Sequence, residues 1–277
     1  MSNRSIIKSW RPQRERQSAI HEAAQVLPPG RYQEFDPFLL MAEDWFWHGT
    51  FLDHPHRGIE TVTYVISGHM GHYDNKSGHE GVLGPGDVQW MTAGHGVIHK
   101  EDPVPGEEVR SLQLWVNLPR ESKLMPPRYQ DLSASRVPMR EEDGYLIRVY
   151  SGRMAGLAAP TDNVVPIVMA EIHLEAGRSL EVDVAGDHNG FLYILEGEGA
   201  FGANAHRGRS GEVLWLSPES AGEPISHLTL HAIAPLRVLI YTGKPLHQPV
   251  VAYGPFVMTS IEEIQEAFDD YHGGRFI

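Results

Sequence analysis

The sequence predicts an all-β protein built from two copies of one β-fold, with a short helix near its C-terminal end. Gly (28) and Pro (20) exceed their usual shares of about 7% and 5% in 277 residues, which favours many turns and short strands. Short runs rich in Val, Ile, Tyr and Trp alternate with turn residues. Two strand-and-turn motifs also recur at nearly constant offsets, as a duplicated fold requires.

Several apolar runs have the length of strands in a sandwich or barrel. They span residues 59–66, 87–91, 112–118, 167–174, 190–195, 213–216 and 236–242. A polar stretch near residues 120–145, which holds Pro126, Pro127 and Pro138, is typical of a domain boundary. The sequence therefore predicts one domain over residues 1–130 and a second over residues 145–277.

The strongest helical pattern comes last in the chain. Ser260 is suited to cap a helix whose first turn carries Glu262 and Glu263. We expect a helix over about residues 260–271, ended by the glycine pair that follows it. Its expected apolar face consists of Ile261, Ile264, Ala267 and Phe268.

Two motifs of the first half return in the second half. Tyr64-Val-Ile-Ser-Gly68 returns 129 residues later as Tyr193-Ile-Leu-Glu-Gly197. The Gly-x-x-x-Trp-x-Thr of residues 86–92 returns 125 residues later as Gly-x-x-x-Trp-x-Ser. Strand-and-turn signals are common in any β-protein, but two separate motifs at similar offsets indicate one fold used twice.

Composition excludes several classes of site and partner. Without Cys, the chain has no disulfide, thiolate metal site or thiol nucleophile. Its 23 Lys and Arg against 36 Asp and Glu give a net charge of −13, which disfavours direct contact with nucleic acid. The first residues lack the apolar stretch of a secretory signal, and no apolar run approaches the roughly 20 residues that span a bilayer. We expect a cytoplasmic protein that binds neither nucleic acid nor membrane.

A group of His and Glu residues is the strongest candidate for chemistry. On an extended chain His54, His56 and Glu60 share one face, and further on His99 and Glu101 do the same. Imidazole nitrogens and carboxylates suit divalent Fe, Mn, Ni, Cu or Zn. A lone His-x-His among 16 histidines is more often a surface or core feature than a metal site. Two same-face pairs inside repeat-aligned motifs are stronger evidence.

The repeat provides an internal control for this group. The two offsets map the five positions onto Asp183, Ala185, Asn189, Pro224 and Ser226. The second copy has therefore lost the set, as expected for a site that only one domain keeps. The mapping is sensitive to loop length, and two histidines of the second copy, His188 and His227, lie close to it.

Five segments, in this order along the chain, resemble the pirin family of the cupin superfamily. They are His54-Pro-His-Arg-Gly-Ile-Glu-Thr-Val-Thr-Tyr64, Gly86-Asp-Val-Gln-Trp-Met-Thr-Ala-Gly94, Ile98-His-Lys-Glu101, Leu112-Gln-Leu-Trp-Val-Asn-Leu118 and Tyr253-Gly-Pro-Phe-Val-Met258. The resemblance implies two tandem cupin domains, each a jelly-roll β-barrel. It also implies one metal ion in the N-terminal domain, held by His54, His56, His99 and Glu101, and a C-terminal domain without these ligands.

Pirins usually hold iron, so the resemblance implies Fe(II), with Mn, Ni, Cu, Zn and Co as alternatives that suit the same ligands. The general cupin pattern takes its carboxylate from the position of Glu60, which makes Glu60 the alternative to Glu101; its structural role would be a hydrogen bond within a strand. His95 is either a rim group beside a ligand or a solvated loop residue. Arg57 either steadies Glu101 or an anionic substrate, or forms a structural salt bridge.

Some pirins are quercetin 2,3-dioxygenases, so the resemblance implies metal-dependent cleavage of a flavonol by O₂ with loss of carbon monoxide. Glu101 would stay on the metal or leave it to take the substrate proton. Other pirins are non-enzymatic, metal-dependent regulators that bind a transcription factor or a metabolic enzyme, and this is the alternative function. Side chains that would line a pocket for a flat substrate, or else belong to the core, are Phe46, Trp47, Phe51, Trp90, Met91 and Trp115.

Overall fold

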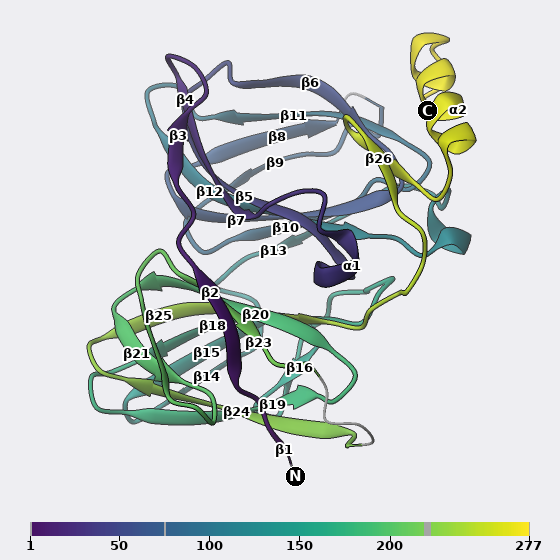
Figure 1. The fold of residues 1–277 in the computed structure, drawn as a ribbon. Helices are drawn as coiled ribbons and strands as arrows, with labels where there is room; N and C mark the ends of the chain where they lie inside the picture. Colours follow the sequence, from purple (N-terminus) through teal and green to yellow (C-terminus); the bar gives the residue numbers. More distant parts are fainter. Residues whose placement is uncertain (1, 75, 219–222, 277) are drawn as a thin grey trace. The chain divides into compact units, whose positions relative to one another are not determined.

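The computed structural model describes residues 2–74, 76–218 and 223–276, which form two compact units (Figure 1). The site unit comprises residues 13–135 and 246–277, and the companion unit comprises residues 1–12 and 136–245. Each unit is thus assembled from two separate stretches of the chain. The division predicted from sequence, with domains at residues 1–130 and 145–277, gives each domain one continuous stretch of chain. That these two stretches are the domains that fold independently stays a prediction.

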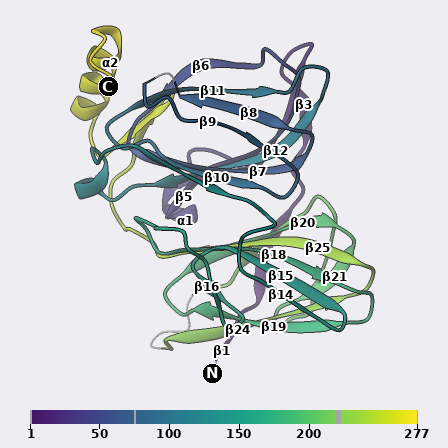
Figure 2. The ribbon, with the colours of Figure 1, turned by 180° about the vertical axis from the view of Figure 1, so that it is seen from behind.

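The site unit contains two antiparallel sheets that face each other in both ribbon views (Figures 1 and 2). The larger sheet has the order β13 (Arg128–Leu132), β10 (Val88–Thr92), β7 (Ile59–Ser67), β12 (Val109–Asn117), β5 (Phe38–Phe46), β4 (His21–Leu27), β3 (Arg14–Arg16). The smaller sheet has the order β6 (Phe51–His56), β11 (Val97–Pro103), β8 (Met70–Asp74), β9 (Glu80–Leu83).

The companion unit has the same two-sheet plan. Its larger sheet has the order β14 (Met139–Glu142), β15 (Tyr145–Ser151), β18 (Ile167–Leu174), β25 (Leu236–Gly243), β20 (Asn189–Glu196), β23 (Val213–Leu216), β2 (Ile6–Trp10). Its smaller sheet consists of β1 (Ser2–Asn3), β24 (Ile225–Ala232), β21 (Glu198–Phe201) and β22 (His206–Arg209), with β19 (Ser179–Ala185) paired to β24.

Matching strands confirm that one fold is used twice. The order β10-β7-β12-β5 in the site unit corresponds to β23-β20-β25-β18, and β6-β11-β8-β9 corresponds to β19-β24-β21-β22. The repeated sequence motifs lie on β7 and β10 in one unit and on β20 and β23 in the other. Every apolar run predicted to be a strand is one, with ends that differ by a few residues at most.

The stretch expected to be a linker is largely structured. Residues 120–145 contain the 3₁₀ turn η1 (Arg120–Ser122) and the strands β13 and β14, each of which lies at the edge of a large sheet. Edge strands pair on one side only, so they tolerate the Pro residues and charges that indicated a linker. The remaining short elements are α1 (Tyr32–Phe35) and the hairpins β16 (Arg153–Met154) with β17 (Leu157–Ala158) and β26 (Val251–Tyr253) with β27 (Phe256–Met258).

The predicted C-terminal helix is α2 (Ile261–His272), within one residue of the expected bounds. Ser260 and Glu263 form a capping box, in which each side chain accepts a hydrogen bond from the backbone N–H of the other. Ile264 and Ala267 are buried as expected and Phe268 is half-buried, but Ile261 is 62% exposed. Among the described residues, no helix is long and apolar enough to cross a membrane.

The interiors of the two units differ in character. The companion unit has one apolar core between its sheets, including Leu192, Ile194, Leu228 and Leu230. In the site unit two apolar clusters lie at the ends of β7, one around Ile59 and one around Val65. Because side chains alternate along a strand, Thr61 and Thr63 share the inward face between these clusters. The interior of the site unit is therefore polar in its middle.

A buried carboxylate in the companion unit should make that unit sensitive to acid. Burial opposes ionisation of Glu171, but an ion pair with His173 (3.0 Å) and one with Arg237 (2.7 Å) prevail and lower its pKa to about 2. Because the folded pKa lies below the ordinary 4.5, the stabilisation is complete above about pH 4.5 and is lost as the pH falls towards 2.

We expect Glu171→Gln to lower the free energy of unfolding at pH 7 by about 3 kcal/mol, the value of a shift of this size. The difference between variant and parent should shrink progressively below pH 4.5. Urea unfolding followed by fluorescence at pH 7, 4 and 3 measures it, and Glu175→Gln, an exposed neighbour, is the matched control. A pH-independent difference would show that the charge of Glu171 is not the cause.

Candidate metal centre

Two adjacent antiparallel strands of the site unit bring the predicted histidines together. His54 on β6 lies directly across from His99 on β11, and His56 lies across from Val97. One nitrogen from each of His54, His56 and His99 lies within 4.8 Å of the others. In the part of the chain that the structure describes, no other group of three His, Cys or acidic side chains meets this geometry.

The hydrogen bonds of these rings leave nitrogens available to a cation. Nδ1 of His54 donates to the Leu52 carbonyl oxygen (2.7 Å), and Nδ1 of His99 pairs with Nε2 of His72 (2.9 Å). His56 and His99 are only 2% and 1% exposed, yet among the described residues Nε2 of each ring has no hydrogen-bond partner within normal geometry. Buried polar nitrogens without partners are costly, so the arrangement fits a bound divalent metal ion.

The protonation states also suit metal binding. Burial, with a smaller contribution from the neighbouring His54, lowers the pKa of His56 to about 3. Burial and the adjacent His56, His54 and His72 hold the pKa of His99 well below its usual value. Metals bind the neutral form of imidazole, so these ligands need to lose no proton near neutral pH.

Glu101 lies in the same cavity but outside the group of three nitrogens. Its two carboxylate oxygens accept hydrogen bonds from Thr63 Oγ1 (3.1 Å) and Gln113 Nε2 (2.8 Å). Burial raises the pKa of Glu101, although His54, Gln113 and Thr63 favour the charged form. A buried carboxylate in this position is stabilised by a nearby cation and is suited to accept a proton.

Glu60 lies on the opposite face of its strand, so the same-face prediction for residues 54, 56 and 60 is wrong. Gly58 turns the chain between β6 and β7, which belong to different sheets. Its φ of +77° and the approach of the Val257 carbonyl oxygen, 2.1 Å from where a Cβ would lie, require glycine there. Alternation along β7 then places Glu60 opposite to Thr63, where it accepts a hydrogen bond from Thr92 (2.7 Å).

Arg57 has a structural role. Its Nε donates to the His95 carbonyl oxygen (2.6 Å) and its guanidinium pairs with Asp270 of α2 (2.9 Å). The guanidinium also lies over the Phe276 ring, 4.5 Å from its centre. These contacts favour the salt-bridge interpretation of Arg57. His95 lines a separate cavity of about 370 Å³ beside them and is not among the three clustered histidines.

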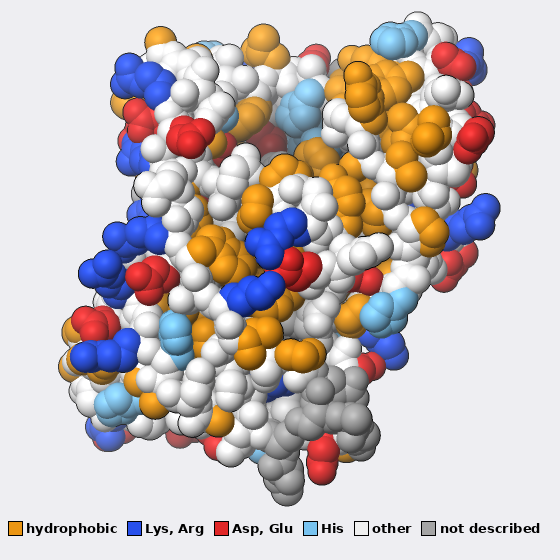
Figure 3. All heavy atoms as spheres, viewed as in Figure 1, with side chains coloured by type: hydrophobic (Ala, Val, Ile, Leu, Met, Phe, Trp, Pro, Cys, Tyr) orange, Lys and Arg blue, Asp and Glu red, His pale blue; other side chains and the backbone are white. Residues whose placement is uncertain are grey.

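The cavity in front of the histidines measures about 240 Å³. The space-filling view shows a hollow with a histidine side chain at its edge (Figure 3). Of the aromatic and apolar residues considered from sequence, Phe46, Phe51 and Trp115 line this cavity. Trp90 and Met91 are completely buried and do not line it, and Trp47 is 43% exposed.

Sequence reasoning missed three polar residues around the histidines, namely His72, Thr63 and Gln113. His72 supports His99, while Thr63 and Gln113 hold Glu101. Each is a polar residue on the inward face of a strand, and that face also carries apolar residues: Ile59 and Val65 with Thr63, Met70 with His72, and Trp115 with Gln113. That break in alternation was a signal, but which partner each residue meets depends on pairing between distant strands.

The hydrogen bond from His72 should tune the affinity for metal. A second imidazole that accepts from Nδ1 of His99 keeps Nε2 unprotonated and fixes the ring. We expect His72→Phe to weaken metal affinity about 10-fold to 100-fold, and His72→Gln, whose amide oxygen still accepts, to restore most of it. Competition with a chromogenic chelator measures the affinity. Equal affinities in both variants and the parent would exclude this role.

The companion unit has apolar residues where the site unit has these polar ones. A bulge adds one residue to β6 opposite β11, whereas β19 and β24 pair without a shift. With this bulge counted, the strand pairs place Val182, Val184, Leu228 and Leu230 at the positions of His54, His56, His99 and Glu101. The sequence offsets pointed instead to Asp183, Ala185, Pro224 and Ser226, which is corrected here. The conclusion that the second copy lacks the ligands holds, since all four equivalents belong to its apolar core.

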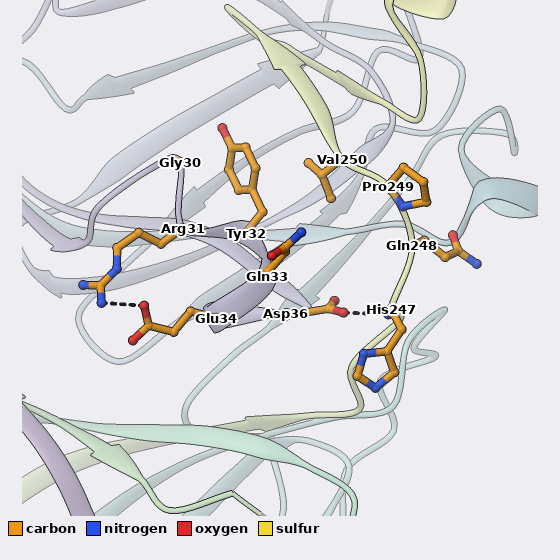
Figure 4. A pocket seen from close by; sticks show the side chains of 10 residues that line it. All are labelled: Gly30, Arg31, Tyr32, Gln33, Glu34, Asp36, His247, Gln248, Pro249 and Val250. Carbon is orange, nitrogen blue, oxygen red and sulfur yellow. Dashed lines mark hydrogen bonds and ion pairs between the residues drawn. The ribbon is translucent and has the colours of Figure 1, made fainter.

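A separate hollow of the site unit, about 860 Å³ in volume, contains no histidine of the cluster. Tyr32 and Val250 lie toward one end of it, and the charged groups lie toward the other (Figure 4). Arg31 pairs with Glu34, and Asp36 accepts a hydrogen bond from the His247 backbone N–H (2.7 Å). These groups satisfy one another and form no metal site.

Comparison with known proteins identifies relatives over nearly the whole chain. A family model described as pirin matches residues 13–116, and one described as the pirin C-terminal cupin domain matches residues 169–277. Pirin-1 of Arabidopsis thaliana is 41% identical over 244 residues, which cover 87% of this chain and 83% of that protein. A Pseudomonas aeruginosa protein named "Putative quercetin 2,3-dioxygenase" is 41% identical over 256 residues, 87% of each chain.

Solved structures agree with these matches. A crystal structure titled quercetin 2,3-dioxygenase, from Acinetobacter baumannii, is 31% identical, with a TM-score of 0.86 over 100% of this chain and 99% of that one. A Geobacillus kaustophilus protein is 52% identical, with a TM-score of 0.88 over 90% of this chain and 99% of that one. The predicted fold class, all-β with two cupin domains and a C-terminal helix, is confirmed.

Proposed function

The chain belongs to the pirin family, and from this premise we propose that it is a metal-dependent dioxygenase that cleaves a flavonol such as quercetin with O₂. The observation that carries the proposal is the convergence of one nitrogen from each of three histidines beside a buried glutamate in the same part of the site unit. The names of the similar proteins from P. aeruginosa and A. baumannii support the choice of reaction.

We propose His54, His56, His99 and Glu101 as the ligand set, with Fe(II) as the ion. When bound, such an ion would lower the pKa of a coordinated substrate hydroxyl and favour reaction of the resulting electron-rich anion with O₂. Three neutral imidazoles and one carboxylate leave a net charge of about +1 around a divalent ion, which favours an anionic substrate. The net reaction adds both oxygen atoms to the flavonol and releases one of its carbons as carbon monoxide.

Glu101 is also the proposed proton acceptor, a role in which it would leave the ion, since one carboxylate cannot be a ligand and take the substrate proton at once. Its oxygens are held by Thr63 and Gln113, so the carboxylate is fixed in the cavity beside the histidines. Its raised pKa makes it a better base than an exposed carboxylate. In this role it takes the proton of the substrate hydroxyl, and Thr63 and Gln113 remain as donors that orient it.

The walls of the cavity suit a flat aromatic substrate. Phe46 and Phe51 pack edge to face, with ring centres 4.8 Å apart, on one side of the histidines. Trp115 packs edge to face against His56 at 5.1 Å. Apolar walls favour an aromatic ring and exclude water, while the histidines and Glu101 provide the polar end of the site.

Turnover tests the proposal. Protein loaded anaerobically with Fe(II) is mixed with quercetin and O₂, and the loss of flavonol absorbance and the release of carbon monoxide are followed. We expect one molecule of carbon monoxide to be released for each molecule of flavonol consumed. Absence of turnover with Fe(II), Mn, Co, Ni, Cu and Zn would refute the dioxygenase. The regulatory alternative would then remain, and it would require the capture of a defined protein partner.

A further inference from the structure

We propose that the substrate extends past Trp115 into a second cavity, so that the site selects elongated aromatics of at least two ring systems over single-ring analogues. The inference rests on the proposed function for the identity of the metal-binding end of the substrate. It adds a substrate class and a subsite, both within the site unit.

Two cavities share a wall. The second cavity measures about 230 Å³ and, like the first, is lined by Leu40 and Trp115. The other residues that line the second cavity are Pro29, Tyr32, Leu39, Ala252, Gly254 and Val257. It contains no charged side chain, so it is suited to a ring without charge.

The volumes indicate that one cavity is too small for a flavonol. Pockets for ligands of this size usually measure roughly 300–1,000 Å³. The first cavity, at about 240 Å³, must also hold a metal ion, and the second, at about 230 Å³, has no ligand for one. Each alone lies below the usual range and the two together lie within it. In the proposed arrangement a single-ring compound occupies the first cavity only, whereas a flavonol occupies both.

Trp115 connects the second cavity to the reacting groups. Its ring contacts His56, and its Nε1 donates to Gln113 Oε1 (3.1 Å). Gln113 in turn donates to Glu101 (2.8 Å). A ring that packs on Trp115 therefore lies against the residue that helps to orient the proposed base, and Trp115 is a specificity-determining residue in this arrangement.

Tyr32 stands between the second cavity and a more polar hollow. Tyr32 lines both the second cavity and the large hollow, and Val250 lies near it in that hollow (Figure 4). Beyond them the hollow presents Gln33, Asp36 and Gln248. Hydroxyl groups at the outer end of the substrate can meet hydrogen-bonding groups there, as the hydroxylated outer rings of flavonols require.

Binding to the zinc-loaded protein tests the subsite without turnover. The probes are quercetin and maltol, which share the 3-hydroxy-4-oxo chelating unit, but maltol has one ring only. Ala252→Leu fills the second cavity, and Tyr253→Leu, on the opposite face of β26 and 70% exposed, is its matched control. Quenching of Trp fluorescence gives the dissociation constants.

We expect Ala252→Leu to weaken quercetin binding about 10-fold to 100-fold, the value of one buried ring, and to change maltol binding less than about 2-fold. Tyr253→Leu should change neither. Tyr32→Ala, which removes a wall of the cavity instead of filling it, should also weaken quercetin selectively. An unchanged zinc stoichiometry shows that the variants are folded.

Three results would overturn the subsite. They are unchanged quercetin affinity in Ala252→Leu and Tyr32→Ala, equal losses of affinity for quercetin and maltol, and no binding of quercetin by the parent protein. These outcomes differ from failure of the proposed function. A protein that binds quercetin through both cavities but does not turn it over with Fe(II) would refute the dioxygenase and retain the subsite.

Discussion

Replacing His56 or His99 by Ala should reduce bound metal from stoichiometric to background while both units stay folded. Each replacement removes one of three converging nitrogens, and two imidazoles cannot hold a divalent ion against a chelator. Neither ring makes hydrogen bonds that join the sheets, so the loss of fold should be limited to the loss of packing. Metal analysis after dialysis and circular dichroism together measure the outcome.

His227→Ala is the matched control for this prediction. His227 lies on β24, the strand of the companion unit that corresponds to β11, and pairs with Asp183 at 2.9 Å. Its replacement should leave the metal content unchanged. Stoichiometric metal in both the His56 and the His99 variant would remove these residues from the ligand set.

Replacing Glu101 by Gln should lower turnover of quercetin about 100-fold to 10,000-fold, the usual contribution of a general base. The amide has the shape of the carboxylate and can still accept from Gln113, but it cannot take a proton. Because Glu101 lies outside the three-nitrogen group, we expect the variant still to bind the metal ion, with a lower affinity than the parent. Steady-state rates at saturating metal separate the loss of the base from loss of the ion.

Glu60→Gln distinguishes the two candidate carboxylates. Glu60 is completely buried and bonded to Thr92 on the other face of β7, so its isosteric replacement should leave turnover and metal content near those of the parent. If Glu60→Gln abolished activity while Glu101→Gln did not, the roles assigned to the two residues would be reversed.

Much of the fold could be predicted from local sequence. Strands such as β7 and β18 are short segments rich in Val, Ile and other apolar residues and bounded by turn residues, and α2 carries its cap and its apolar face within a few residues. The histidines could be found from the sequence because side chains two residues apart on a strand point to the same face of the sheet. The repeat added the information that only one copy carries them.

What the sequence did not reveal depends on long-range geometry. The turn at Gly58 moves Glu60 out of the site, although the local pattern placed it with His54 and His56. The bulge in β6 shifts the equivalents of His54 and His56 by one residue, and a connection that is four residues longer between β23 and β24 than between β10 and β11 shifts those of His99 and Glu101 by four. Offsets taken from the flanking motifs contain neither shift. Thr63 and Gln113 become important only because β7 pairs with β12 in a register that brings both to Glu101.

The assembly of each unit from two stretches was also hidden from local patterns. β2 joins the companion unit, where it pairs with β23, about 200 residues away in sequence. The C-terminal segment joins the site unit, where Asp270 of α2 pairs with Arg57. Pairing of distant segments is decided by the burial of whole faces, which short motifs do not encode. The polar edge strands β13 and β14 looked like a linker for the same reason.

Anomalous diffraction from crystals of the protein loaded with a divalent transition metal tests the central claim most directly. The account predicts one strong peak in the site unit, at bonding distance from a nitrogen of His54, of His56 and of His99, with space for a substrate oxygen. A peak bound elsewhere, or histidine rings turned away from one another in metal-replete crystals, would contradict it.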